Sequence, residues 1–251
     1  MSAAQPTTAE GHVDGSAPII ELRAVRAGYD GIEVLHGVDL AVGAGQVVAI
    51  LGPNGAGKST TLKVLAGLHP ASSGDVLVAG RRVNGARADD LARRGLCLIP
   101  EGRGIFPNLT VRENLWMMTH RGKDLGAVTE RTVARFPPLG VLLDRTAGTL
   151  SGGQQQMVAM ARGLATDPAL LILDELSMGL APIIVEDLYR LVASVAAEGV
   201  SILVVEQFAH EVLDVADVAA IILHGKVQFE GEPTAVADAL QDAYLGGSVN
   251  L

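Results

Sequence analysis

The segment GPNGAGKS at residues 52–59 constrains this chain more than any other part of its sequence, because it fits the pattern G-x-x-x-x-G-K-[ST]. The apolar run 46–51 before it predicts a buried strand, and a helix is predicted over 58–66. In such a strand–turn–helix unit, glycines let successive backbone N–H groups face one anion, and the helix N-terminus adds partial positive charge. The segment therefore predicts a phosphate-binding loop.

The side chains of this loop indicate what kind of phosphate compound it binds. Lys58 is placed for the β- and γ-phosphates of a nucleoside triphosphate, and the Ser59 hydroxyl is placed for Mg²⁺. A glycine-rich turn with an exposed lysine is the alternative without a ligand. The nucleotide contacts predicted from the loop are Gly52, Pro53, Asn54, Gly55, Ala56, Gly57, Lys58, Ser59 and Thr60.

Strands and helices alternate along most of the chain, which predicts an α/β fold with a mostly parallel sheet covered on both faces. The expected strands are 19–25, 34–42, 46–51, 75–79, 96–99, 170–173, 201–205 and 218–223, and the expected helices are 58–66, 88–94, 110–120, 129–136, 154–164, 182–197 and 209–216. Thr110 and Glu113 have capping-box spacing at one helix start. We expect residues 18–240 to form one domain with a helical insertion at about 101–150, flanked by a disordered tail at 1–17 and a C-terminal tail at 241–251.

The composition argues against several classes of protein. With 28 acidic and 19 basic residues the net charge is −9, which argues against a nucleic-acid binder. The single cysteine, Cys97, cannot form a disulfide within the chain. No apolar run reaches the roughly 18 residues of a membrane span, and residues 1–17 lack the basic start and apolar core of a secretory signal. We therefore expect a soluble cytoplasmic protein.

A pair of carboxylates follows the apolar run at 170–173. Ligands of parallel sheets bind at the carboxyl ends of the strands, where Asp174 and Glu175 stand. Asp174 is placed to hold Mg²⁺, and Glu175 is placed to accept a proton from the water that attacks the γ-phosphate. A solvated strand end is the alternative, which the phosphate loop upstream disfavours.

The segment LSGGQ at residues 150–154 opens another helix. Its serine and two glycines again present N–H groups to an anion, although by itself this is only a capped helix. Placed between a phosphate loop and an Asp-Glu strand end, it resembles the signature of the ATP-binding-cassette (ABC) family. The resemblance covers about residues 19–232, and the order of the three motifs is highly specific.

The resemblance implies a P-loop NTPase (RecA-like) core with an N-terminal antiparallel β subdomain and an inserted α-helical subdomain. It also implies an ATPase in which two cassettes sandwich two ATP molecules, each signature closing over the nucleotide of its partner. The implied contacts across that interface are Ser151, Gly152, Gly153 and Gln154. Tyr29 matches the aromatic residue that stacks on adenine in this family; a strand-end tyrosine packed on the sheet is the alternative.

Four positions depart from the usual family pattern. Glu101 stands where a glutamine is usual and can still face Mg²⁺ or water, so it is counted with the nucleotide and metal contacts. Gln207 stands where a histidine is usual and can hydrogen-bond a γ-phosphate. Leu176 replaces the usual proline and Ala181 the usual loop aspartate. The predicted sets are therefore Glu175, Lys58 and Gln207 for catalysis, and Ser59, Asp174 and Glu101 for the metal.

With these departures, segments 99–114, 150–157, 179–188 and 205–207 resemble the ATP-binding subunits of branched-chain amino-acid importers. That resemblance implies a second ABC ATPase subunit in a hetero- or homodimer, membrane permease subunits, indirectly a solute-binding protein, no nucleic acid, and a place on the inner face of the cell membrane. A related urea or amide importer and a soluble non-transport ABC ATPase are the alternatives.

The helical insertion corresponds to the part of the family that holds a permease's coupling helix. Phe106, Trp116, Met117 and Met118 could line such a groove, and a role in the hydrophobic core is the alternative for the last three. Arg103 could meet an acidic coupling loop or be solvated.

Overall fold

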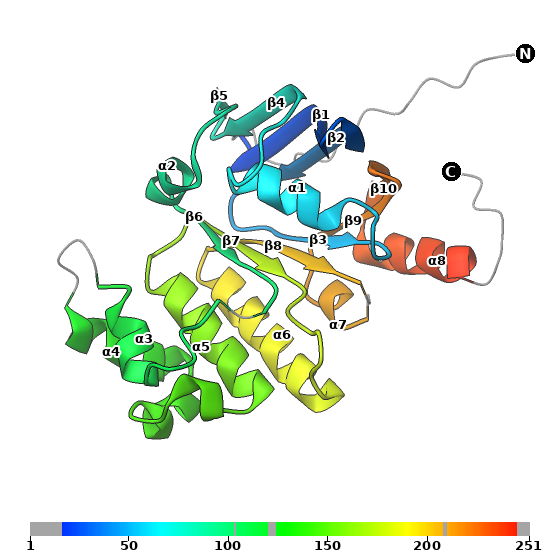
Figure 1. The fold of residues 1–251 in the computed structure, drawn as a ribbon. Coiled ribbons are helices and arrows are strands. Elements are labelled where there is room, and N and C mark those ends of the chain that lie inside the picture. Colours follow the sequence, from blue (N-terminus) through cyan, green and yellow to red (C-terminus); the bar gives the residue numbers. More distant parts are fainter. Residues whose placement is uncertain (1–16, 103, 120–123, 208–209, 245–251) are drawn as a thin grey trace, which may run out of the picture.

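The computed structural model describes residues 17–102, 104–119, 124–207 and 210–244 (Figure 1). Two sheets form its framework. The central sheet has the order β10-β9-β3-β8-β7-β6, with all neighbours parallel except the β9–β10 hairpin. Its strands are β3 Val47–Leu51, β6 Leu96–Ile99, β7 Leu170–Asp174, β8 Ser201–Glu206, β9 Val218–Leu223 and β10 Lys226–Gly231. The smaller sheet is antiparallel, in the order β2-β1-β4-β5: β1 Ile20–Tyr29, β2 Ile32–Val42, β4 Ser73–Val78 and β5 Arg81–Arg82.

The helices cover the central sheet on both faces. They are α1 Lys58–Leu65, α2 Ala88–Arg93, α3 Val111–Trp116, α4 Leu125–Arg135, α5 Gly152–Leu164, α6 Pro182–Ala197, α7 His210–Leu213 and α8 Pro233–Tyr244, with 3₁₀ helices η1 Pro137–Leu142 and η2 Ala147–Thr149. In Figure 1, α1 lies between the antiparallel sheet and the central sheet, and α5 and α6 cover the opposite face. The predicted α/β fold with an antiparallel β subdomain and a helical insertion is confirmed.

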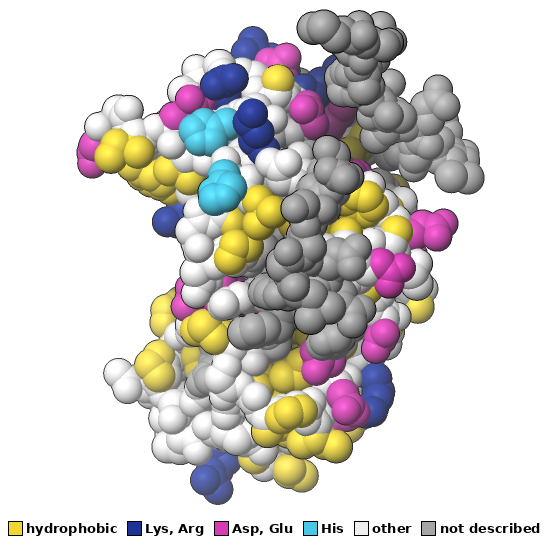
Figure 2. Space-filling view, turned by 90° about the vertical axis from the view of Figure 1, so that its right-hand side faces the viewer, with side chains coloured by type: hydrophobic (Ala, Val, Ile, Leu, Met, Phe, Trp, Pro, Cys, Tyr) yellow, Lys and Arg dark blue, Asp and Glu magenta, His cyan; other side chains and the backbone are white. Residues whose placement is uncertain are grey.

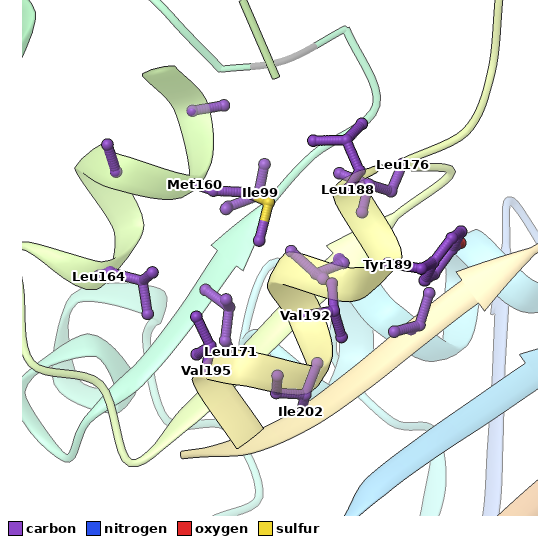
Figure 3. Close-up of a cluster of buried hydrophobic side chains, with 14 of the residues drawn as sticks. Ile99, Met160, Leu164, Leu171, Leu176, Leu188, Tyr189, Val192, Val195 and Ile202 are labelled. Atoms are coloured by element: carbon purple, nitrogen blue, oxygen red, sulfur yellow. The ribbon is translucent and has the colours of Figure 1, made fainter. Parts of the chain in front are cut away.

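Every residue of β3 is buried, which explains why this strand is a continuous apolar run rather than an alternating one. Val48 and Ile50 pack into the cluster beneath the antiparallel sheet and α1. The remaining three residues face the cluster formed by α5, α6 and the helical insertion. Figure 3 shows the second cluster, where Met160 of α5 and Val192 of α6 meet Leu171 of β7. The phosphate loop therefore follows a strand that is buried along its whole length.

The helical insertion begins as its sequence predicts. Thr110 Oγ1 accepts from the Glu113 N–H at 3.1 Å, and the Thr110 N–H donates to Glu113 Oε2 at 2.7 Å, so the capping box is confirmed. The next helix begins at residue 125 rather than 129, because the Asp124 side chain accepts from the Ala127 N–H at 2.8 Å and caps it. It ends at Arg135, one residue before the predicted end at 136 and two residues before the first proline.

The C-terminal part of the chain differs from the prediction. The helix α8 begins with Pro233 as its first residue and continues to Tyr244, so the expected boundary at residue 240 falls inside a helix. The edge strand β10 was not predicted, because its alternately half-buried and exposed residues lack the apolar signal of the central strands. The expected tail at 1–17 lies outside the described residues apart from residue 17, as does Arg103.

The surface mixes apolar and charged side chains. Figure 2 shows hydrophobic side chains in several separate groups, with acidic side chains along one margin of that face. Among the described residues, no helix combines the length and the apolar character that crossing a membrane requires.

Candidate functional site

The turn between β3 and α1 depends on two glycines that leave no room for a side chain. Gly57 has a backbone φ of 108°, and a Cβ there would lie 2.9 Å from Leu35 Cδ2. A Cβ at Gly52 would lie 2.3 Å from the Ile222 carbonyl oxygen. Because Gly57 is also the N-cap of α1, no side chain caps the first N–H groups of this helix. These groups can therefore bind an anion.

The Lys58 side chain is folded into this loop and only 4% exposed. Its Nζ donates to the Gly52 carbonyl at 2.8 Å and the Pro53 carbonyl at 3.2 Å. The same atom lies 3.8 Å from Glu175 Oε1. The alternative of an exposed lysine is therefore wrong. An arriving phosphate would therefore meet a cation that is already in place, held by two neutral carbonyls and by the nearby Glu175 carboxylate.

A hollow of about 140 Å³ lies over the loop. Its lining joins the loop to the end of β7 and to β2, through Val34, Pro53, Asn54, Gly55, Gly57, Lys58, Ser59, Thr60 and Glu175. The structure thus brings the phosphate loop and the carboxylate at 175 to one place, although more than a hundred residues separate them in sequence. We call this space the loop hollow.

Asp174, the last residue of β7, and Glu175, which follows it, have carboxylates in different environments. Asp174 Oδ1 is buried and has no hydrogen-bond partner among the described residues. Burial, then the charges of Glu175 and Glu101, raise the pKa of Asp174 from 3.8 to about 6. Glu175 adopts a left-handed φ of 48°, and its N–H donates to the Val205 carbonyl at 2.9 Å. Glu101 is close enough to Asp174 for its charge to contribute to this pKa shift.

This arrangement of oxygens fits Mg²⁺. A buried carboxylate oxygen without a donor, next to further carboxylates, favours a hard divalent cation. Among the described residues, no group of three or more His, Cys, Asp or Glu side chains could hold a metal ion alone. Ser59 at the start of α1 is exposed, so its hydroxyl could join Asp174, with the phosphates and water completing the shell.

The LSGGQ segment forms a different kind of helix start. Ser151 caps α5 by accepting from the Gln154 N–H at 3.3 Å, and Gln154 Oε1 accepts from the Ser151 N–H at 3.0 Å. Gly153 is buried, and a Cβ there would lie 2.3 Å from Ile184 Cγ2, so glycine is required where α5 meets α6. As far as the structure describes this chain, residues 151–154 do not line the loop hollow.

Tyr29 ends β1, and its side chain is 37% exposed. Its ring stacks on the His69 ring, with centroids 4.3 Å apart and planes 30° apart, and Lys63 Nζ lies 5.8 Å from its centroid. The His69 Nε2 lies 2.9 Å from the Gly28 carbonyl oxygen, which fixes the imidazole. The sequence interpretation missed His69, because its partners lie about 40 residues away.

A second residue that the sequence interpretation missed is Glu206, the last residue of β8. It is 2% exposed and accepts hydrogen bonds from the Ser177 N–H at 2.9 Å, the Ser177 hydroxyl at 2.8 Å and the Tyr189 hydroxyl at 2.6 Å. A carboxylate directly after a four-residue apolar run was the available signal. Gln207 follows it and is half-buried.

Comparisons with known proteins agree with this geometry. A family model described as ABC transporter matches residues 35–177, more than half of the chain. The high-affinity branched-chain amino acid transport ATP-binding protein BraG of Pseudomonas aeruginosa is 38% identical over 224 residues, covering 87% of this chain and 96% of that protein. The chain belongs to the ABC transporter family. It is therefore an ATP-binding ATPase cassette of a transporter, and the predicted family is confirmed.

Two further members show how far the ABC cassette is shared. A crystal structure of the ADP conformation of an ATP-binding cassette of an ABC transporter superposes with a TM-score of 0.81 at 26% identity, covering 92% of this chain and all of that one. The lipopolysaccharide export system ATP-binding protein LptB of Haemophilus influenzae is 32% identical over 230 residues, covering 89% of this chain and 95% of LptB. The named cargoes of these ABC relatives therefore differ.

Proposed function

We propose that this ABC ATPase drives the import of branched-chain or other hydrophobic amino acids through separate permease subunits. The main observation in favour of ATP hydrolysis is that Lys58 Nζ lies 3.8 Å from Glu175 Oε1 in the loop hollow. Support for the cargo comes from the 38% identity to BraG and from the resemblance of the segments that carry Glu101 and Gln207 to such importers.

The catalytic roles follow from where each group stands. Lys58 binds the β- and γ-phosphates, and the amides of the loop bind the phosphate oxygens. Glu175 accepts the proton of the attacking water. Mg²⁺ held by Ser59 and Asp174, with Glu101 nearby, would neutralise phosphate charge. The Tyr29 ring stacks on adenine, with His69 supporting it from one face.

A second cassette completes each site. The signature residues 151–154 do not reach this chain's loop hollow as far as the structure describes it, so they contribute to the site of another subunit. Gln207 then faces the γ-phosphate from the end of β8. The pair is a homodimer or a heterodimer with a second ABC ATPase.

The permease is proposed to dock on the helical insertion. Phe106 is 42% exposed, Trp116 58% and Met117 42%, which is unusual for side chains of this size and argues against a core role for Trp116. Met118, by contrast, packs against the core. Through this surface the protein is held on the cytoplasmic side of the inner membrane, and a solute-binding protein delivers the cargo to the permease.

The proposal is tested by reconstitution. The chain is purified with candidate permeases in mild detergent, and ATP-driven uptake of labelled leucine into vesicles is followed. Glu175→Gln is expected to abolish uptake and coupled ATP turnover while ATP binding stays intact. The exposed Glu186, paired with Arg190 on α6, provides the matched control Glu186→Gln, which is expected to behave like the wild type.

Other outcomes would replace parts of the proposal. Uptake of urea or an amide in place of leucine would assign the chain to a related importer. Stimulation of ATP turnover by nucleic acid at physiological salt would contradict a transport role. Full turnover by Glu175→Gln would remove that residue from catalysis.

A further inference from the structure

The segment that carries Glu175 has an unusual backbone. Residues 175–181 join β7 to α6, and we call them the Glu175 loop. Glu175 itself has a φ of 48°, a left-handed conformation that side chains other than glycine rarely adopt. Such a conformation persists only where the surrounding structure holds it firmly. The contacts that hold this loop therefore set the direction of the catalytic carboxylate.

Polar contacts from two elements, β8 and α5, hold the loop. The Glu175 N–H donates to the Val205 carbonyl of β8 at 2.9 Å. From α5, the buried Gln156 Nε2 donates to the Leu176 carbonyl at 3.0 Å. From the end of β8, Glu206 accepts from both the N–H and the hydroxyl of Ser177. Three successive residues of the loop are thus fixed.

Glu206 is the centre of this arrangement. Its Oε1 accepts from Ser177 N–H and from the hydroxyl of Tyr189 on α6, and its Oε2 accepts from the Ser177 hydroxyl. No ion pair of Glu206 occurs among the described residues, although the side chain is 2% exposed. A buried carboxylate without a cation is costly, and burial raises its pKa, so packing alone does not explain it. Figure 3 labels Tyr189 of α6 and Leu176 of the Glu175 loop.

We propose that Glu206 is a positioning residue for ATP hydrolysis: by tying Ser177 to β8 and α6 it holds the Glu175 loop so that the Glu175 carboxylate faces the attacking water. The inference rests on the proposed role of Glu175. Glu206 does not touch the nucleotide and acts through Ser177. Because Gln207 follows it directly, the same anchor joins the Glu175 loop to the strand end proposed to face the γ-phosphate.

The test compares four variants in steady-state ATP turnover by the full chain, at protein concentrations where turnover per chain is constant. Glu206→Ala is expected to lower kcat at least about tenfold while the KM for ATP changes less than about threefold, since misplacement of a catalytic group affects the chemical step. Glu206→Gln restores most of kcat, because its amide oxygen can accept from Ser177 N–H and Tyr189 while its NH₂ donates to the Ser177 hydroxyl. Val192 is fully buried on α6, one turn after Tyr189. Val192→Ala is therefore the matched control for lost stability, and it is expected to keep the wild-type kcat. The turnover of Glu175→Gln tests the proposed role of Glu175 independently, so a failure of that role can be told apart from a failure of this inference.

A second measurement does not depend on turnover. Amide hydrogen exchange at Ser177 is expected to accelerate at least about tenfold in Glu206→Ala and to stay at the wild-type rate in Val192→Ala. If Glu206→Ala does not fold, Ser177→Ala and Tyr189→Phe each remove one donor and are expected to lower kcat by about threefold or more without a change in KM. An unchanged kcat in these variants, or equal losses in Glu206→Ala and Val192→Ala, would overturn the inference. Loss of turnover in Glu206→Ala with none in Glu175→Gln would instead refute the proposed role of Glu175.

Discussion

The phosphate loop and the LSGGQ segment are both glycine-rich turns that open a helix, yet they differ in how that helix start is satisfied. At α1 the N-cap is Gly57, which has no side chain to cap the helix. At α5 Ser151 and Gln154 cap each other's backbone N–H groups. The first turn therefore has free donors for phosphate within its own chain, whereas the second is satisfied without a ligand.

The glycines of the two turns also serve different purposes. Gly57 needs its backbone conformation, with a φ of 108°. Gly153 has no positive φ and is needed because Ile184 lies where a Cβ would be. Only the phosphate loop contains a buried cation, Lys58. Similar sequence composition thus produces one turn that binds ligand and one that first of all packs helices together.

The largest effect is expected from the cation. Lys58→Ala should lower ATP turnover by about 10²–10³-fold and weaken ATP binding at least about tenfold, because the charge that meets the phosphates is lost. Titration with a fluorescent ATP analogue measures the binding. Lys226→Ala, which removes an exposed lysine of β10, is the control and should bind normally. Near-normal affinity of Lys58→Ala would refute its role.

A pair of alanine substitutions separates the two turns. Gly57→Ala should weaken ATP binding at least about tenfold, since the loop cannot keep its backbone conformation. Gly153→Ala should lower the free energy of unfolding by about 1–3 kcal/mol through its clash with Ile184 while leaving ATP affinity unchanged. Urea unfolding and the same titration measure both quantities. Adding Ile184→Ala to Gly153→Ala should restore part of the stability; equal losses of affinity in the two single variants would contradict the comparison.

Asp174 provides a pH-dependent test without Mg²⁺. Its pKa is raised to about 6 in the folded protein against 3.8 ordinarily, so between these values the folded state binds more protons and stability falls as pH rises. Asp174→Asn should therefore be more stable than the wild type at pH 7.5, by about 1–2 kcal/mol after allowance for partial exposure. The gain should shrink towards zero as the pH falls to about 4, as thermal unfolding at a series of pH values would reveal. A stability gain that is the same at every pH would show that the buried charge is not its cause.

The smallest effect is expected at the second turn. Ser151→Ala removes the cap of α5 and should cost about 1 kcal/mol of stability, with ATP binding to the single chain unchanged. Thermal unfolding and nucleotide titration measure the two effects. Weakened ATP binding by the isolated chain would mean that the signature contacts its own nucleotide.

Much of the site could be predicted because its residues follow one another in the sequence. Residues 52–59 form a loop whose chemistry lies in its own backbone, and Asp174 and Glu175 follow an apolar strand. The contacts of Glu206 and His69 could not be predicted, because their partners lie 29 and about 40 residues away and meet only after the sheets form. The exposure of the Trp116 side chain could not be predicted either, because the apolar character of a residue does not indicate which face of its helix is buried.

The same reasoning applies to the fold. The central strands were predictable because burial on both faces gives continuous apolar runs, as in β3 and β8. The edge strand β10 was not, because its alternate residues are exposed and its composition resembles that of a loop.

The central claim is that, within one chain, ATP binds at the phosphate loop and not at the signature. Amide hydrogen exchange can be measured with and without a slowly hydrolysed ATP analogue, at concentrations where light scattering detects only single chains. This one experiment reports the protection of the amides in both turns. We predict protection of the amides at 52–60 and none at 150–155. Protection at 150–155 alone, or none at 52–60, would contradict the account.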